Sequence, residues 1–360
     1  MKKILVVLLI AVMSLTLFGK VKAVLLVNGT LGDKSFFDSA ARGMKMIEEQ
    51  LGVETKIIEM GYNPSEWGPT LEDISDLGEY DIIIVGTWQM VELVERVAPM
   101  YPDTTYIIFD TAVDYSKGNL DNVYSILYKQ NEGSFLAGAM AAMVSTSDKF
   151  KYSLPDKKII GFLGGMDIPV INDFLVGYIE GALYIDPDIK VAISYVGAWN
   201  DPAKGKEFTL SMYRQGADVV FAVAGETGNG VLAAAKEMDR WAIGVDSDMQ
   251  LLYEEKDMDI VKHTLSSMLK NVDYSLLRAV KLYLEGKLPV GQVEALGLKE
   301  RGVGLADNPY FREIMEADPW ILVKLRELEL AIIRGDIKVT SAYGMSNEEL
   351  NKIRDAVRPK

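Results

Sequence analysis

Short apolar runs rich in β-branched residues alternate with longer segments of helical spacing along most of this chain. The first four apolar runs are Val21–Val27, Val53–Met60, Asp81–Val85 and Tyr106–Phe109. Between the first two lies Ser35–Leu51, in which apolar or small residues recur every three or four positions. Continuous apolar strands separated by helices are typical of a parallel sheet that helices cover on both faces. The pattern predicts a doubly wound α/β lobe.

A second series of the same kind follows the polar stretch 145–158. Its predicted strands and helices, in chain order, are Ile159–Leu163, Val170–Tyr184, Val191–Val196, Pro202–Gln215, Val219–Val223, Gly228–Met238 and Ala242–Val245. Turn-forming Asp-Pro and Gly-Ala-Asp sequences separate the first two of these helices from the strands that follow them. The chain therefore holds two similar α/β units in tandem, and its 360 residues are enough for two domains.

The pattern changes after the last of these strands. Ser266–Glu285 has the spacing of one long helix and Pro319–Gly335 that of another, while Ile337–Val339 is a short predicted strand. Ser346 begins a terminal helix, and Glu349 three residues later completes a capping box. The sequence thus predicts further elements beyond the two tandem units.

These patterns divide the chain into two lobes and a tail. The N-terminal lobe is predicted to contain residues 20–130 plus about 262–300, and the C-terminal lobe about 131–261 plus about 301–340. Residues 341–360 form a helical tail. Because no low-complexity linker separates the units, we expect several short crossings to join them.

The N-terminus has the pattern of a secretion signal. Lys2 and Lys3 precede the apolar run Ile4–Phe18, whose 15 residues are fewer than a membrane-spanning helix needs. Residues 1–19 are the predicted signal peptide; cleavage after Ala23, or retention of the segment as an anchor, are the alternatives. We expect the protein to be exported to the periplasm or to the outer face of the cytoplasmic membrane.

The composition excludes several classes of function. The 52 acidic and 38 basic residues give a formal net charge of −14, which opposes binding to nucleic acid or to anionic membrane surfaces. The chain has no cysteine and a single histidine, His263, which excludes thiolate chemistry, lipidation through cysteine, zinc–thiolate sites and a His-based triad with a second histidine. Nucleophile-elbow, phosphate-loop and zinc-protease motifs are missing too. We expect no metal, no cofactor and no catalytic residue, with nucleoside cleavage by paired carboxylates as the enzymatic alternative.

Candidate ligand contacts come directly after the predicted strands. Ligands of open α/β sheets bind at the carboxyl ends of the strands, and the loops there contain Asp33, Asp110, Trp199, Gly225 and Asp246. Carboxylates accept pairs of hydroxyl hydrogen bonds, glycine amides donate, and aromatic faces stack on rings. The combination suits a neutral polyol attached to a flat ring. Asp33 has a second interpretation, as the cap of the following helix.

Five ordered segments resemble the basic membrane protein (Bmp) lipoproteins. They are Gly32–Phe36, Gln130–Gly138, Gly161–Val170, Ile243–Asp248 and Ser266–Asp273. Members of this family are substrate-binding components of ABC importers with the type I periplasmic-binding-protein fold. The resemblance implies that fold here, an α/β protein of two Rossmann-like lobes with a multi-crossing hinge. It also implies a small-molecule ligand, and an ABC permease with its ATPase as partners.

The resemblance further implies a purine nucleoside as the favoured ligand, with its base stacked between Phe36 and Phe174. Each of these side chains also fits the apolar stripe of its own helix, so a place in the core is the alternative for both. Trp199 stands where the family often has Phe, and its larger indole would reshape the base pocket. A receptor for another small polar ligand, such as a sugar, is the alternative function.

The resemblance also implies the polar contacts. Asp33 and Asp110 would read the polar edges of the base, while Asp246 and Lys270 would hold the ribose hydroxyls. For Lys270 the alternative is structural, because it lies in the long predicted helix and could pair with Asp273.

Overall fold

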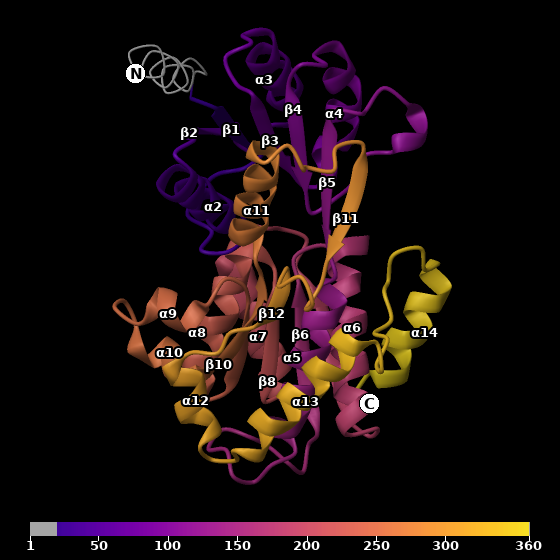
Figure 1. The fold of residues 1–360 in the computed structure, drawn as a ribbon. Coiled ribbons are helices and arrows are strands. Elements are labelled where there is room, and N and C mark those ends of the chain that lie inside the picture. The colour runs from indigo at the N-terminus through magenta and orange to yellow at the C-terminus, as the bar shows by residue number, and fades with distance from the viewer. Residues whose placement is uncertain (1–19, 360) are drawn as a thin grey trace, which may run out of the picture.

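The structure, a computed structural model, describes residues 20–359 as two lobes, each built on a six-stranded sheet (Figure 1). The predicted signal peptide, residues 1–19, lies outside the described residues. In the first sheet every neighbouring pair is parallel, in the order β11-β5-β4-β3-β1-β2. Its strands are β1 (Lys22–Val27), β2 (Glu54–Glu59), β3 (Ile82–Gly86), β4 (Thr105–Phe109), β5 (Val123–Tyr128) and β11 (Gln292–Leu296).

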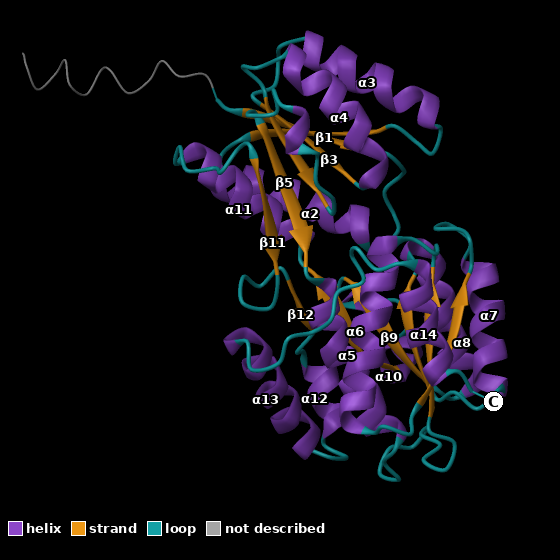
Figure 2. Cartoon of the chain, turned by 90° about the vertical axis from the view of Figure 1, so that its right-hand side faces the viewer, coloured by secondary structure: helices purple, strands orange, loops and turns teal. Residues whose placement is uncertain are grey.

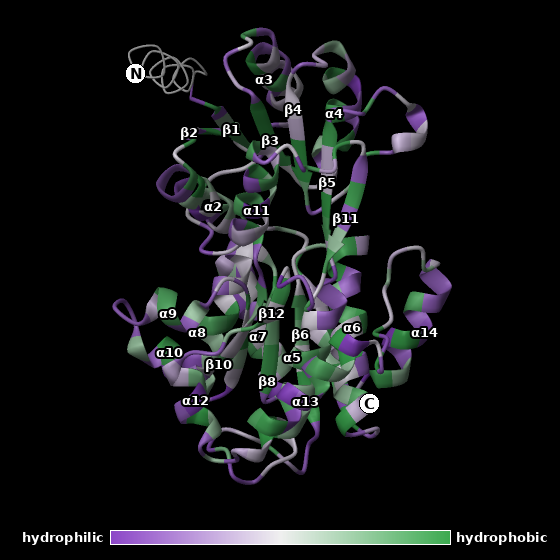
Figure 3. Ribbon diagram, viewed as in Figure 1, coloured by the Kyte–Doolittle hydropathy of each residue, from purple (hydrophilic) through white to green (hydrophobic). Residues whose placement is uncertain are grey.

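The second sheet has the order β12-β10-β9-β8-β6-β7, and it is parallel except for β12, which runs antiparallel to β10. Its strands are β6 (Ile159–Gly164), β7 (Lys190–Tyr195), β8 (Val219–Val223), β9 (Trp241–Asp246), β10 (Thr264–Lys270) and β12 (Val303–Leu305). Strands such as β3 and β8 are continuously apolar because helices cover both faces of each sheet. Figure 3 shows these strands as hydrophobic inside more mixed outer helices.

The helices of the first lobe are α2 (Phe36–Leu51), α3 (Pro64–Asp76), α4 (Val91–Val97) and α11 (Val272–Leu284). Those of the second lobe are α5 (Gln130–Ser145), α6 (Pro169–Ile185), α7 (Pro202–Arg214), α8 (Asn229–Met238), α9 (Met249–Tyr253), α10 (Met258–His263), α12 (Pro309–Met315), α13 (Trp320–Arg334) and α14 (Asn347–Val357). Short 3-10 turns are η1 (Trp88–Met90), η2 (Ala98–Met100), η3 (Tyr115–Lys117) and η4 (Gly225–Gly228). None of these helices is long and apolar enough to cross a membrane, a statement that covers residues 20–359.

Along the described chain there are three crossings between the lobes. The first joins β5 to α5, the second joins β10 to α11, and the third joins β11 to β12. Figure 2 shows the two lobes stacked one above the other with these connections between them. Several short crossings limit the relative motion of two domains to rotation about a hinge. The predicted fold class, two Rossmann-like lobes with a multi-crossing hinge, is confirmed.

One long predicted helix is wrong. Within Ser266–Glu285 the first residues extend β10, which lies in the second sheet between β9 and β12, and the helix α11 begins only at Val272. The serines made the segment look like an amphipathic helix, but their hydroxyls are buried. Ser266 Oγ donates to Ala306 O at 2.9 Å, and Ser267 Oγ accepts from Met249 N at 3.0 Å. Residues 264–270 therefore belong to the second sheet rather than to the N-terminal lobe.

Other strands were missed or misplaced by the sequence pattern. Strands β5, β11 and β12 were not predicted, and Ile337–Val339 does not form a strand. Instead, the carbonyls of Val339 and Thr340 accept hydrogen bonds from Asn131 Nδ2 at 3.1 and 3.2 Å. The predicted terminal helix is confirmed as α14, with the full capping box of Ser346 and Glu349.

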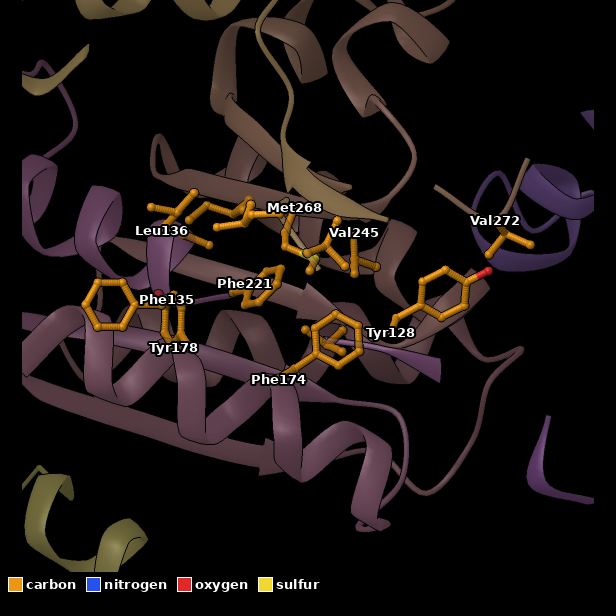
Figure 4. Close-up of a cluster of buried hydrophobic side chains, with 14 of the residues drawn as sticks. Tyr128, Phe135, Leu136, Phe174, Tyr178, Phe221, Val245, Met268 and Val272 are labelled. Carbon is orange, nitrogen blue, oxygen red and sulfur yellow. The ribbon is translucent and has the colours of Figure 1, made fainter. Parts of the chain in front are cut away.

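Helices α5 and α6 pack closely because glycines of each helix face the backbone of the other helix. A Cβ added to Gly138 would lie less than 3.0 Å from the backbone of Tyr178, and one added to Gly181 would lie equally close to the backbone of Phe135. Figure 4 shows the aromatic core beside this crossing, from Phe135 and Tyr178 to Phe174. Interiors this dense do not accommodate an added methyl group without strain.

Replacing Gly181 with alanine should lower the free energy of unfolding by about 1–3 kcal/mol, because the added Cβ overlaps backbone that cannot move aside. Urea denaturation measures this loss. The matched control is Gly304→Ala in β12, where an added Cβ meets no atom of the described chain within 4 Å. A loss in Gly304→Ala as large as that in Gly181→Ala would contradict the packing argument.

Candidate ligand-binding site

A cavity of about 200 Å³ lies between the two lobes. Its walls come mainly from the carboxyl ends of strands in both sheets and from the loops that follow them. The first lobe contributes Asn28, Asp33, Phe36, Phe37, Tyr62, Pro64, Trp67, Thr87, Trp88, Gln89 and Asp110; the second contributes Ile168, Val170, Ile171, Phe174, Trp199, Val223, Ala224, Gly225, Glu226, Val245, Asp246 and Lys270. The structure thus brings all eight residues that the sequence singled out to one cavity.

Three polar residues reach the cavity through unusual backbone conformations. Thr87 follows β3, Asp110 follows β4 and Asp246 ends β9, and their φ angles are 73°, 65° and 63°. Residues other than glycine rarely adopt this left-handed region, at a cost of about 1–3 kcal/mol each. The strain turns the chain sharply at the end of each strand and directs these residues to the cavity. Strained backbone of this kind is concentrated at functional sites.

A buried ion pair between the lobes forms the polar centre of the cavity. Lys270 Nζ, at the end of β10, lies 2.6 Å from Asp110 Oδ1, and the two side chains are only 3% and 12% exposed. The same ammonium group lies 4.7 Å from the ring centre of Phe174 and 5.7 Å from that of Phe36. Aromatic faces stabilise a cation at such distances. Lys270 therefore links the acidic and aromatic parts of the cavity.

The structural alternative for Lys270 is wrong. Lys270 ends a strand rather than lying in a helix, so it does not share a helical face with Asp273. Asp273 instead pairs with Arg42, whose Nη2 lies 3.3 Å from its carboxylate. The same guanidinium donates to Ser247 Oγ of the second lobe at 3.0 Å. Arg42 thus joins the lobes outside the cavity.

Burial perturbs the acids of the cavity. It raises the pKa of Asp246 to about 6, while the charge of Lys270 and the hydroxyl of Ser35, which donates to Asp246, act in the opposite direction. Burial also raises the pKa of Asp110 against the opposing effect of Lys270. The pKa of Asp33 is raised by burial too, although backbone N–H groups oppose the shift. A ligand that changes the surroundings of these three acids would therefore also change their protonation.

Asp33 serves as a helix cap. Its carboxylate accepts from the backbone N–H groups of Ser35 and Phe37 at 2.9 Å and from that of Asp38 at 3.1 Å. These bonds satisfy free N–H groups at the start of α2. Capping is thus the role in which the structure shows this side chain, which also lies at the cavity wall.

The two phenylalanines occupy different positions. Phe174 is only 2% exposed and packs 6.3 Å from Phe221, at the end of the aromatic core that reaches the cavity (Figure 4). Phe36 is partly buried and packs 5.3 Å from Phe109. Each ring has a core contact and also lines the cavity, so core packing and ligand contact are compatible for both.

Trp199 and the glycines shape the wall of the second lobe. A Cβ on Gly165 would lie within 3.0 Å of the Trp199 ring, so the indole packs against a loop position that only glycine can occupy without a shift. Gly225 has a φ of 57° and begins the turn η4. The absence of a side chain at Gly165 makes room for the indole beside the cavity.

Sequence reasoning missed several cavity residues. They include the aromatic side chains of Tyr62, Trp67 and Trp88 and the polar side chains of Thr87 and Gln89. Residues 87–89 directly follow β3, so the strand-end rule that found Asp110 would also have found them. Tyr62 comes three residues after β2, and the same rule would have found it. Trp67 lies within α3, and only the fold brings it to the cavity.

Two doubly wound lobes around a polar and aromatic cavity define a solute-binding protein of the type I periplasmic-binding-protein fold. The chain belongs to the Bmp family, described as ABC transporter substrate-binding protein PnrA-like, whose family model matches residues 20–324. The fold, the family and the expected class of function agree.

Known relatives support this assignment. The chain is 32% identical to basic membrane protein A2 of Borrelia garinii over 292 residues, which are 80% of each chain. It is 31% identical to the ABC transporter nucleoside-binding protein BmpA of Lactococcus lactis over 326 residues, or 87% of each chain. The crystal structure of an ABC transporter solute-binding protein from Aeropyrum pernix is similar with a TM-score of 0.79 and 28% identity, covering 94% of this chain and 99% of that one.

Replacing Lys270 with methionine should destabilise the protein by about 3–5 kcal/mol at pH 7, because Asp110 is left buried without its cation. The loss should shrink toward pH 4. A carboxyl whose pKa is raised in the folded state favours folding at low pH and loses that contribution as the pH rises, and removing Lys270 enlarges the shift for Asp110.

Urea denaturation at several pH values measures both effects. The control is the double variant Lys270→Met with Asp110→Asn, which should recover part of the stability because the unpaired charge is gone. A loss that is independent of pH and unchanged in the double variant would contradict the ion-pair argument.

Proposed function

We propose that this protein binds a nucleoside, with a purine nucleoside favoured, between its two lobes and presents it to an ABC permease that is driven by a separate ATPase. The observation that carries the proposal is the cavity itself. Aromatic walls at Phe36 and Phe174 lie beside the polar group of Asp110, Asp246 and Lys270. A nucleoside has the same two parts, a flat base and a ribose with hydroxyl groups.

The chemistry of the cavity supports a neutral ligand of this shape. The rings of Phe36 and Phe174 would stack on the base, since base–aromatic stacking contributes about 1–3 kcal/mol per base. Asp246 would accept hydrogen bonds from ribose hydroxyls, while Lys270 would donate to ribose oxygens. Trp199, Gly225 and the polar edges offered by Asp33 and Asp110 would complete the site. The acids oppose a phosphorylated ligand by repulsion.

The proposed event is closure of the lobes rather than the breaking of a bond. A ligand that contacts both lobes stabilises the closed arrangement over the open one by its differential affinity. Closure creates an outer surface that a permease can recognise. The family consists of substrate-binding proteins of ABC transporters, and this role requires no reaction at the ligand.

The place of action follows from the proposed role. Substrate-binding proteins of ABC transporters act outside the cytoplasm, so we propose that residues 1–19 direct export. The chain has no cysteine for a lipid anchor, and release into the periplasm or retention by an uncleaved signal are the two arrangements that agree with this composition. Fractionation of cells that express the full-length protein distinguishes them.

Calorimetric titration of ligand-stripped protein, residues 20–360, against a nucleoside panel tests the proposal. We expect binding to guanosine, inosine or adenosine without release of free base over hours. Binding to a sugar but to no nucleoside would overturn the nucleoside assignment and leave the solute-binding class intact. Release of base would instead support the enzymatic alternative.

Phe36→Ala should weaken nucleoside binding by about 1–3 kcal/mol, which is roughly 5- to 150-fold in Kd, because one stacking face is lost. The matched control is Phe208→Ala on α7, a partly buried phenylalanine that does not line the cavity. That variant should leave Kd unchanged. Unchanged affinity in Phe36→Ala together with a lowered free energy of unfolding would make Phe36 a core residue only.

Nucleoside binding should also weaken as the pH falls below about 6. Burial raises the pKa of Asp246 to about 6, so in the empty cavity this carboxyl gains a proton near that pH and can no longer accept hydrogen bonds at both oxygens. Titrations at pH 7.5 and 5.0 measure the change. Asp246→Asn should bind weakly at both pH values, with a flatter dependence; equal Kd values for the unmodified protein at both would contradict this role.

A further inference from the structure

We propose that Arg354, on the C-terminal helix α14, is a positioning residue that holds one wall of the ligand cavity in place. The wall is the segment 167–172, which leads from β6 into α6. That it serves nucleoside binding rests on the function proposed above, whereas the positioning itself does not.

The guanidinium of Arg354 contacts three residues outside its own helix, and it also lies 3.4 Å from Asn351 Oδ1 within α14. Nη2 lies 2.7 Å from Asp167 Oδ1, 2.8 Å from Asn172 Oδ1 and 2.7 Å from Tyr195 OH, so its two N–H groups are shared among three acceptors. Nη1 donates to Asp167 Oδ2 at 3.2 Å, and the guanidinium carbon lies 5.1 Å from the centre of the Tyr195 ring. The Arg354 side chain is only 11% exposed. A planar group with five N–H donors can bind several acceptors at once, which a lysine ammonium cannot do in the same geometry.

These partners lie at the two ends of the cavity wall. Asp167 and Asn172 bracket Ile168, Val170 and Ile171, and all three of these apolar residues line the ligand cavity. One guanidinium therefore fixes both ends of the segment. Asn172 is held further, since its Nδ2 donates to Asp167 at 2.9 Å.

The segment that precedes α14 makes a second set of contacts with α6. Asp173 accepts from Ser341 Oγ at 2.6 Å, from Ala342 N at 2.8 Å and from Gln130 Nε2 at 2.7 Å. Gln130 begins α5, directly after the first crossing between the lobes. The next residue after Asp173 is Phe174, the proposed stacking ring. Asp173 thus connects both the segment before α14 and the start of α5 to the N-terminal part of α6.

Arg354 and its helix α14 lie in the part of the chain that the family model does not match. The match ends at residue 324, and α14 begins at Asn347. Figure 1 shows α14 lying against the side of the second lobe, next to α6. Arg354 and Asp167 are 187 positions apart, so the contact closes a long loop onto the cavity wall. A wall held in its binding conformation reduces the entropy lost when a ligand binds.

Hydrogen–deuterium exchange without any ligand tests the positioning. Arg354→Gln should increase the exchange rate of amides in residues 165–174 roughly tenfold, because local opening of the segment becomes easier. The matched control is Lys352→Gln, a neighbouring cation of α14 whose side chain is 72% exposed; it should leave the exchange unchanged. Arg354→Lys, which can satisfy fewer acceptors, should fall in between and takes the place of Arg354→Gln if that variant does not fold.

Titration with inosine as the probe tests the consequence for binding. We expect the Kd of Arg354→Gln to rise about three- to tenfold, with Kd unchanged in Lys352→Gln. In Arg354→Ala, guanidinium ion at roughly 10–50 mM, far below its denaturing range, should restore part of the affinity. It would enter the polar space between α14 and α6 that Arg354 borders, and sodium chloride at equal concentration should have no such effect.

The outcomes separate the two proposals. If the unmodified protein does not bind inosine but the exchange result holds, the nucleoside assignment fails and the positioning role stands. If exchange in 165–174 does not change in Arg354→Gln, the positioning role is wrong. It is equally wrong if protection falls to the same extent in the core strand 219–223, because Arg354 then supports the whole lobe rather than the cavity wall.

Discussion

The buried ion pair of Lys270 and Asp110 is the interaction on which the arrangement of the cavity depends. Its two charges come from different lobes and are nearly excluded from water, a situation in which each charge is costly without its partner. The pair is therefore complete only when the strand ends of the two sheets face each other. Because Phe36 and Phe174 lie around the same ammonium group, the position of the aromatic walls is tied to this pair as well.

The parallel sheets explain why so many polar groups converge there. All strands of a parallel sheet end at the same edge, and the three crossings of residues 20–359 turn the two edges toward each other. Asp110 and Asp246 bend sharply at these ends through left-handed backbone. The conformational cost of these bends is offset elsewhere by dense packing, most clearly where glycines of α5 and α6 lie against the backbone of the other helix. Densely packed lobes thus support the strained backbone that surrounds the charged cavity.

The sequence predicted most of the fold and the strand-end candidates Asp33, Asp110, Trp199, Gly225 and Asp246 because both depend on local order. The candidates Phe36, Phe174 and Lys270 came from the family resemblance instead. A strand, its end and the polar residue after it are consecutive, so Asp110 and Asp246 could be placed from the pattern alone. Prediction from the sequence pattern was wrong where only burial distinguishes a strand from a helix. Residues 264–270 have serines that mimic a helical pattern, yet the strand pairs with β9 and β12 in the interior. Trp67, which lies inside α3, reaches the cavity only through the path of the chain after β2.

The sequence by itself determined the two tandem α/β units, the exclusion of thiol and multi-histidine chemistry, and the set of strand-end residues, since these follow from periodicity and composition along the chain. Only the tertiary structure decided the partners of the charged groups. Lys270 pairs with a residue 160 positions away, and Arg354 with one 187 positions away. Asp273 and Asp355 are much nearer to them in the sequence. The physical reason is that the strength of an ion pair depends on distance and burial in space, and neither can be read from separation along the chain.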